Sequence, residues 1–262
     1  MSLNKIKAIL LHELYVTKYS VEVINDIILF PLFSIIVFGF MTLYMAGFAG
    51  EVIAQHVLTG MILWQVINIT QYSIAVGCLW DVWSRNLTNI FITPITTVEY
   101  LISYLISGAF KSLFVLIFAS IMSNYIFKFN ILNLGIANIV IYFIILTVFA
   151  FSFAIIVLGL IFRLGTRAQA LSWGLLNIFQ PLMAVIYPAS ILPVPFRTIA
   201  YMLPPTYIFE AARASINNKI IRWDYIGMAL ILDIIFLIVA ITVFNLLFES
   251  SKKSGQFARL ET

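Results

Sequence analysis

Two stretches of the chain carry the same polar and aromatic residues at helical spacing within apolar sequence. Each has a tryptophan, Trp64 or Trp173, then an asparagine four residues later and a glutamine three residues after that. Residues so spaced share a helix face, and amides are poor lipid-facing groups. The pattern fits two interpretations equally well, hydrogen bonding between helices and a translocation path lined by amides and rings. The candidate path residues are Asn68, Gln71, Tyr72, Trp173, Asn177 and Gln180.

Two isolated charges, Lys111 and Asp233, fall near the middle of long apolar segments. A single charge at that depth of a bilayer is costly and usually finds a partner. A structural ion pair between Lys111 and Asp233 is favoured over a proton relay. Alternatively, Lys111 extends its ammonium group to the membrane surface, which would leave Asp233 without a partner.

The sequence shows no catalytic or metal-binding constellation. Its single cysteine, Cys78, excludes a disulfide within the chain, and its two histidines, His12 and His56, are far apart. No metal site and no catalytic residue are therefore expected. No lysine follows a glycine, so the phosphate-binding pattern G-x-x-x-x-G-K-[ST] is absent. If ATP drives this protein, another chain must bind the ATP and Mg²⁺.

The composition indicates a membrane protein. Hydrophobic residues make up 63% of the 262 residues and charged residues only 10%, whereas soluble domains carry about 25% charged residues. Residues 27–50 and 57–80 are two runs of 24 residues without Asp, Glu, Lys, Arg or His. About 20 apolar residues in a helix cross the bilayer core. We therefore expect residues 1–262 to form a single, all-α transmembrane domain.

The hydrophobic pattern predicts an N-terminal helix, six spans and a short tail. Residues 1–20 have helical, amphipathic spacing, which favours a helix in the membrane interface over a plain extension of the first span. The bundle covers 24–248, and residues 249–262 form a cytoplasmic tail. The predicted spans are about 24–46, 56–79, 100–124, 136–162, 169–190 and 225–248.

Basic residues indicate the orientation of the chain. With six spans, both termini lie on one side, and connections alternate between the two sides. The side with the termini receives Lys5, Lys7, Lys18, Arg85, Arg163, Arg167, Lys252, Lys253 and Arg259, and the other side receives Lys128, Arg197, Arg213, Lys219 and Arg222. The larger number of basic residues predicts that both termini are cytoplasmic.

Five of the eight prolines fall in residues 187–222. This segment is too broken to span a membrane and too apolar for a solvated loop. It favours two short helices, at about 195–203 and 206–216, that dip into the outer leaflet before the last span as a re-entrant hairpin.

The connection after the second span, residues 81–100, predicts a short amphipathic helix over 82–93. Because a residue before proline is biased out of the helical region, Pro94 should end this helix near Ile92. Such a helix suits docking on a soluble partner. The candidate contact residues are Trp83, Ser84, Arg85, Asn86, Asn89, Ile90 and Pro94.

Three segments resemble the permease subunits of type-2 ABC exporters. They are Phe30–Phe40 in the first span, Val82–Pro94 with Glu99, which looks like the coupling helix of that family, and Tyr187–Arg213, which looks like its re-entrant hairpin. The order and spacing of these segments extend the resemblance over essentially the whole chain.

The resemblance implies a homodimeric permease with two copies of a separate ATP-binding subunit. The complex would export a lipid-like, glycan-lipid or drug-like substrate across the cytoplasmic membrane, in contact with membrane lipid and without nucleic acid. One rival hypothesis is an ion-coupled secondary carrier that uses Lys111 and Asp233, although no clear internal repeat supports it. A second rival, an integral-membrane enzyme, lacks converging catalytic groups.

Overall fold

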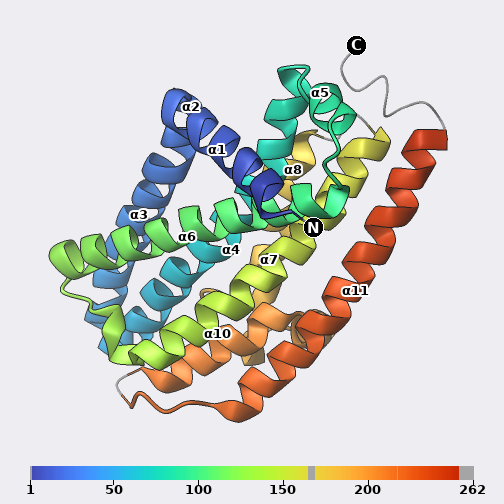
Figure 1. Cartoon of the computed structure of the whole chain (residues 1–262). Coiled ribbons are helices and arrows are strands. Elements are labelled where there is room, and N and C mark those ends of the chain that lie inside the picture. Colours follow the sequence, from blue (N-terminus) through green and yellow to red (C-terminus); the bar gives the residue numbers. More distant parts are fainter. Residues whose placement is uncertain (1, 165–168, 217, 254–262) are drawn as a thin grey trace.

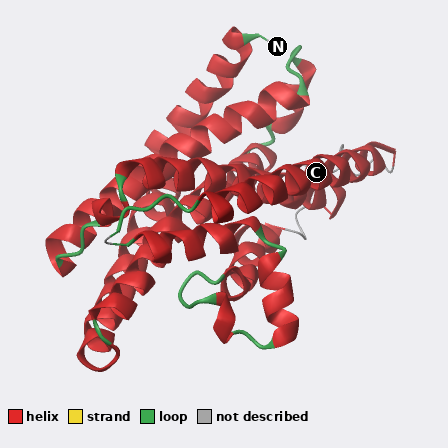
Figure 2. Cartoon of the chain, turned by 90° about the horizontal axis from the view of Figure 1, so that it is seen from below, coloured by secondary structure: helices red, strands yellow, loops and turns green. Residues whose placement is uncertain are grey.

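The fold of this chain is a bundle of helices. The computed structural model describes residues 2–164, 169–216 and 218–253, and every regular element in these ranges is helical (Figures 1 and 2). The longer helices are α1 (Leu3–Tyr19), α3 (Phe30–Ala49), α4 (Glu51–Trp83), α6 (Thr97–Phe127), α7 (Ile136–Leu164) and α11 (Trp223–Lys253). The shorter helices are α2 (Val21–Ile24), α5 (Leu87–Ile92), α8 (Gln169–Phe179), α9 (Val194–Tyr201) and α10 (Pro204–Ser215).

Among the described residues, five helical stretches are long and apolar enough to cross a membrane. They are Val21–Gly47, Glu51–Trp83, Thr97–Phe127, Ile136–Leu164 and Trp223–Lys253. The prediction of an all-α fold is confirmed for the described residues, and the five helices fit a multi-pass membrane protein. Five of the predicted spans correspond to these helices.

The remaining predicted span, at 169–190, is not one continuous helix. The α-helix α8 ends at Phe179 and a 3₁₀ turn follows over Gln180–Met183. Pro181 explains this break, because proline has no N–H to continue the helical bonds and its ring clashes with the preceding turn. Ala184 then takes a left-handed conformation with φ 56°, which turns the chain away from the axis of α8.

The first span accommodates its proline differently. Between α2 and α3 the helix widens into a π-helical turn over Asn25–Leu29, in which the Phe30 N–H bonds the Asn25 carbonyl. Pro31 follows directly at the start of α3. A wider turn before proline relieves its clash with the carbonyl four residues earlier, so the helix continues through the proline.

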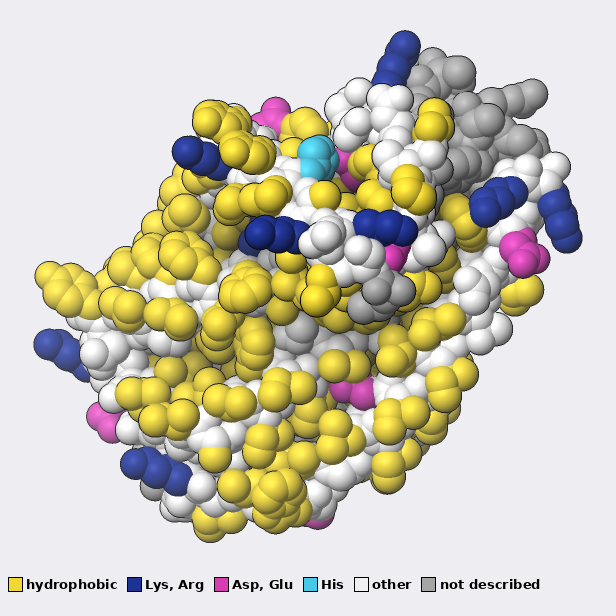
Figure 3. All heavy atoms as spheres, viewed as in Figure 1, with side chains coloured by type: hydrophobic (Ala, Val, Ile, Leu, Met, Phe, Trp, Pro, Cys, Tyr) yellow, Lys and Arg dark blue, Asp and Glu magenta, His cyan; other side chains and the backbone are white. Residues whose placement is uncertain are grey.

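The helices α4 and α7 lie at the centre of the bundle. In each of them 72% of the most apolar window is buried, compared with 28% in Val21–Gly47 and 22% in Trp223–Lys253. The outer helices therefore present apolar side chains such as Phe33, Val37 and Ile234 outward, where lipid would cover them. Figure 3 shows hydrophobic side chains over the middle of one face, with Lys and Arg mostly toward its margins.

The short connecting helices lie close to their predicted positions. Helix α5 ends at Ile92, as Pro94 predicted, but it begins only at Leu87 because α4 continues to Trp83 and Arg85 turns the chain with φ 55°. In the proline-rich segment, α9 and α10 match the two short helices predicted there, and α10 packs on α7 and α11. Both α5 and the end of α11 lie toward the top of Figure 1.

Candidate functional site

A pocket of about 230 Å³ lies where the π-helical turn, α3, α4 and α8 meet. Four of the predicted path residues line it, Asn68 and Tyr72 from α4 and Trp173 and Asn177 from α8. The other lining residues are Asp26, Phe30, Ile69 and Ser172. Side chains predicted from two separate stretches of sequence therefore border one cavity, which is called the path pocket below.

The two predicted glutamines do not line the path pocket. Gln71 is buried and its amide nitrogen donates to the Ser172 carbonyl at 3.2 Å. The amide nitrogen of Gln180 lies 3.8 Å from the Met61 sulfur. Both glutamines therefore connect neighbouring parts of the bundle, which is the hydrogen-bonding interpretation of the pattern.

The polar groups of the path pocket are only partly satisfied within the chain. Asn177 donates to the Trp173 carbonyl at 2.8 Å, one turn back in its own helix. In the part of the chain that the structure describes, the amide of Asn68 makes no hydrogen bond. The Tyr72 hydroxyl donates to Oδ2 of Asp26. The pocket thus keeps hydrogen-bonding capacity for a bound molecule.

Sequence reasoning missed Asp26 and Phe30. Asp26 directly precedes the uncharged run 27–50, and the sequence analysis did not consider it as a site residue. The available signal was the charge itself, because a carboxylate at the start of a span is expensive unless something solvates or pairs it. No Lys, Arg or His nitrogen in the described ranges lies within 4 Å of its carboxylate.

Two tryptophans connect the path pocket to the predicted partner-binding loop. Trp83, the last residue of α4, stacks on Trp173 with ring centroids 6.0 Å apart and an interplanar angle of 18°. Trp80 meets Trp83 edge to face at 5.3 Å. The last residue of α4 before this loop therefore contacts a residue that lines the pocket.

Most residues of the predicted partner contact are accessible. Trp83, Ser84, Arg85, Asn89 and Pro94 are exposed, whereas Asn86 and Ile90 are half-buried. Asn86, Asn89 and Ile90 line a shallow groove of about 270 Å³ between α5 and α1. The α1 side of that groove consists of Ala8, Ile9 and His12. The α5 surface is therefore continuous with α1, which sequence reasoning did not anticipate.

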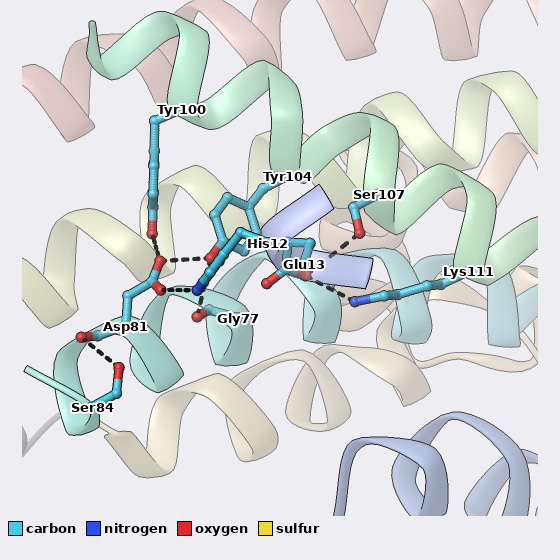
Figure 4. Close-up of polar contacts among 9 residues, drawn as sticks. All are labelled: His12, Glu13, Gly77, Asp81, Ser84, Tyr100, Tyr104, Ser107 and Lys111. Carbon is cyan, nitrogen blue, oxygen red and sulfur yellow. Dashed lines mark hydrogen bonds and ion pairs between the residues drawn. The ribbon is translucent and has the colours of Figure 1, made fainter. Parts of the chain in front are cut away.

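A buried polar network holds α1 against α4 and α6 (Figure 4). Oδ2 of Asp81 accepts hydrogen bonds from Tyr100 at 2.7 Å and Tyr104 at 2.6 Å, and His12 Nε2 lies 3.9 Å from Oδ1. Gly77 makes room for this arrangement, because a Cβ there would lie 2.4 Å from the Tyr104 ring.

The same network contains an ion pair between Glu13 of α1 and Lys111 of α6, with 2.9 Å between Nζ and Oε2. The Glu13 side chain is only 2% exposed. The name α1 clamp is used below for five residues of this network: Asp81, Tyr100, Tyr104, Glu13 and Lys111. Next to the clamp, the backbone N–H of Ser2 donates to Oε1 of Glu99 at 2.7 Å.

The predicted ion pair between Lys111 and Asp233 is wrong. Lys111 pairs with Glu13, and Asp233 makes no ion pair in the described ranges. Asp233 is only 2% exposed, and neither carboxylate oxygen has a hydrogen-bond partner there. The prediction matched two charges by their depth in the membrane, whereas the packing of α1 on α6 supplies a nearer carboxylate.

No protein-family model and no curated protein matches this chain. Within the described ranges, no three His, Cys, Asp or Glu side chains gather as a metal site would require.

Proposed function

We propose that this chain is the permease subunit of an ATP-driven exporter, similar to the type-2 ABC class. The observation that carries the proposal is the stacking of Trp83 on Trp173. It joins the loop predicted to dock on an ATP-binding subunit to the wall of the pocket predicted to border the translocation path. Four of the predicted path residues and the predicted docking loop are thus linked by one aromatic contact.

In the proposed mechanism the ends of the chain and α5 face the cytoplasm. ATP binding in two partner subunits pushes on α5 and the turn at Ser84 and Arg85. The Trp83 ring transmits that displacement to α8, and α8 shifts against α4. The path pocket between them then changes shape and releases its contents outward. This chain hydrolyses no ATP itself, and two copies form the permease.

Co-purification tests the proposal. The chain is co-expressed with a candidate ATP-binding subunit encoded beside it, and the complex is purified and reconstituted in lipid. We expect the complex to hydrolyse ATP and the lone chain to show background turnover only. Arg85→Glu should weaken the complex, because it reverses an exposed charge at the docking surface. Lys128→Glu, at the far end of α6, is the matched control. ATP turnover by the lone chain would contradict the proposal.

One observation favours an ion-coupled carrier as a second candidate. Asp233 is a buried carboxyl in a membrane helix, without a hydrogen-bond partner in the described ranges. Such a group can carry a proton when its surroundings change. A carrier would transport without an ATP-binding subunit and would lose transport on Asp233→Asn. The exporter should tolerate that near-isosteric change and keep ATP-dependent transport.

A further inference from the structure

The path pocket has a negative charge that nothing in its walls balances. Asp26 is the only ionisable acid or base at neutral pH among its eight lining residues. No cationic group of the described residues lies within 4 Å of that carboxylate. Glu22, one helical turn earlier, is exposed and adds a second negative charge on the same side of the helix. A positive group entering the pocket would therefore meet favourable charge.

The carboxylate of Asp26 also has unused bonding capacity. An ionised carboxylate can accept about four hydrogen bonds, and Asp26 accepts one, from Tyr72. Asp26 is half-buried, so part of its surface is open to the cavity that it lines. An ammonium group offers up to three donors to such an acceptor. The neighbouring amide of Asn68 makes no bond in the described ranges and can contribute as well.

Aromatic side chains line the pocket together with this charge. Phe30, Tyr72 and Trp173 line the same cavity as Asp26. The face of an aromatic ring attracts cations, and tryptophan attracts them most strongly. The rings also give the apolar part of a ligand a surface to cover. A carboxylate beside three rings suits a molecule that has one positive group and an apolar body.

We propose that the path pocket binds amphipathic organic cations, recognised by Asp26 together with the rings of Phe30, Tyr72 and Trp173. This inference rests on the proposed function, since it names the substrate class that the pocket would accept for export. Neutral glycans also stack on rings and bond carboxylates. They lack a positive charge to balance the Asp26 carboxylate, so charge is the property to test.

Three probes with one carbon skeleton isolate the effect of charge: 4-phenylbutylamine, 4-phenylbutanol and 4-phenylbutanoate. At neutral pH they are a cation, a neutral alcohol and an anion. Binding to the full-length chain is measured by equilibrium dialysis in a non-ionic detergent, with empty micelles as the reference. We expect the amine to bind about tenfold more tightly than the alcohol, from the carboxylate and cation–π contacts together, and the anion to bind most weakly.

Variants assign the selectivity to Asp26. Asp26→Asn keeps an acceptor for Tyr72 and should reduce the amine to the affinity of the alcohol, whereas Asp26→Glu should retain part of the preference. Glu51→Gln is the matched control, because Glu51 lines a different cavity with Lys128. Equal binding of amine and alcohol to the unmodified chain would overturn the inference. So would a preference that persists in Asp26→Asn.

This assay contains no ATP-binding subunit, so it separates the inference from the proposed function. Amine selectivity that depends on Asp26 supports the site even if no ATP-binding partner is found. Equal binding of the three probes would refute the cation site. It would not affect the proposed exporter, which is tested by complex formation with an ATP-binding subunit.

Discussion

Two carboxylates at the cytoplasmic side of the proposed orientation have opposite surroundings. Asp81 in the α1 clamp is 1% exposed and accepts bonds from two tyrosines, with His12 nearby. Asp26 in the path pocket is half-buried, accepts one bond from Tyr72 and borders a cavity. An enclosed carboxylate that accepts bonds from a neighbouring helix fixes the packing of helices. A partly bonded carboxylate at a cavity is free to bind a ligand.

The clamp also differs from the path pocket in how its charges are balanced. Glu13 and Lys111 neutralise each other within the clamp. The path pocket contains no such pair among its lining residues. The Glu13–Lys111 pair thus joins α1 to α6, whereas the path pocket keeps a carboxylate that has no ion pair in the described ranges.

The largest expected effect is the loss of stability when Asp81 is replaced. Asp81→Ala removes the acceptor of two buried hydroxyls, and we expect the free energy of unfolding to fall by about 4 kcal/mol, since each buried donor left without a partner costs roughly 1–3 kcal/mol. Asp26→Ala should cost less than about 1 kcal/mol, because the freed Tyr72 hydroxyl can reach solvent through the cavity. Unfolding in mixed micelles measures both variants. Equal losses of stability in the two variants would contradict the view that Asp81 has a structural role and Asp26 does not.

A second prediction concerns the ion pair of the clamp. Lys111→Met leaves the Glu13 carboxylate buried without its partner and should destabilise the chain by roughly 3 kcal/mol. The double variant Glu13→Leu, Lys111→Met should recover much of that loss. A cycle of Lys111→Met with Asp233→Leu is the control and should be additive. Strong coupling in this control cycle would instead support the ion pair between Lys111 and Asp233 that the sequence predicted.

A third prediction tests the connection between loop and pocket. Trp83→Leu removes the stack on Trp173 and should cost about 1 kcal/mol of stability. In the reconstituted complex it should lower transport per ATP hydrolysed much more than it lowers ATP turnover. Trp223→Leu, at an exposed tryptophan that begins α11, is the matched variant. If both variants transport equally well per ATP, the stack does not couple the two regions.

The smallest expected effect is a difference in stability between variants of Gln71 and Asn68, two amides of α4. Gln71→Leu should cost about 1 kcal/mol, because the Ser172 carbonyl loses its donor. Asn68→Leu should change stability by less than about 0.5 kcal/mol, because Asn68 makes no bond in the described ranges, and should nevertheless weaken amine binding. Thermal unfolding and equilibrium dialysis of the two variants measure these effects. A larger stability loss for Asn68→Leu would make it a structural residue.

Local chemistry made parts of the fold predictable. Pro94 set the end of α5, and the prolines of residues 187–222 indicated two short helices there. The effect of a proline within a span was less predictable. Pro31 is accommodated by a preceding π-helical turn, whereas Pro181 ends α8. What differs is the packing around each proline, which no local pattern encodes.

Helical spacing predicted the path pocket only in part. Tyr72 follows Asn68 by four residues and lies roughly 40° around the helix from it, whereas Gln71 lies roughly 60° away on the other side. That rotation carries Gln71 into the contact with Ser172. Gln180 follows the end of α8, where helical spacing no longer applies. Asp26 and Glu13 were missed because their importance depends on tertiary neighbours.

The central claim is that the loop around α5 docks on an ATP-binding subunit, and cysteine cross-linking tests it most directly. The native Cys78 is fully buried, so it should react little. Arg85→Cys lies just before α5, and Lys128→Cys lies beyond the other end of α6, roughly 45 Å away along a helix of 31 residues. Each variant is treated with a short cross-linker in the co-expressed complex. The account predicts an adduct with the ATP-binding subunit from Arg85→Cys and none from Lys128→Cys, and the reverse pattern would contradict it.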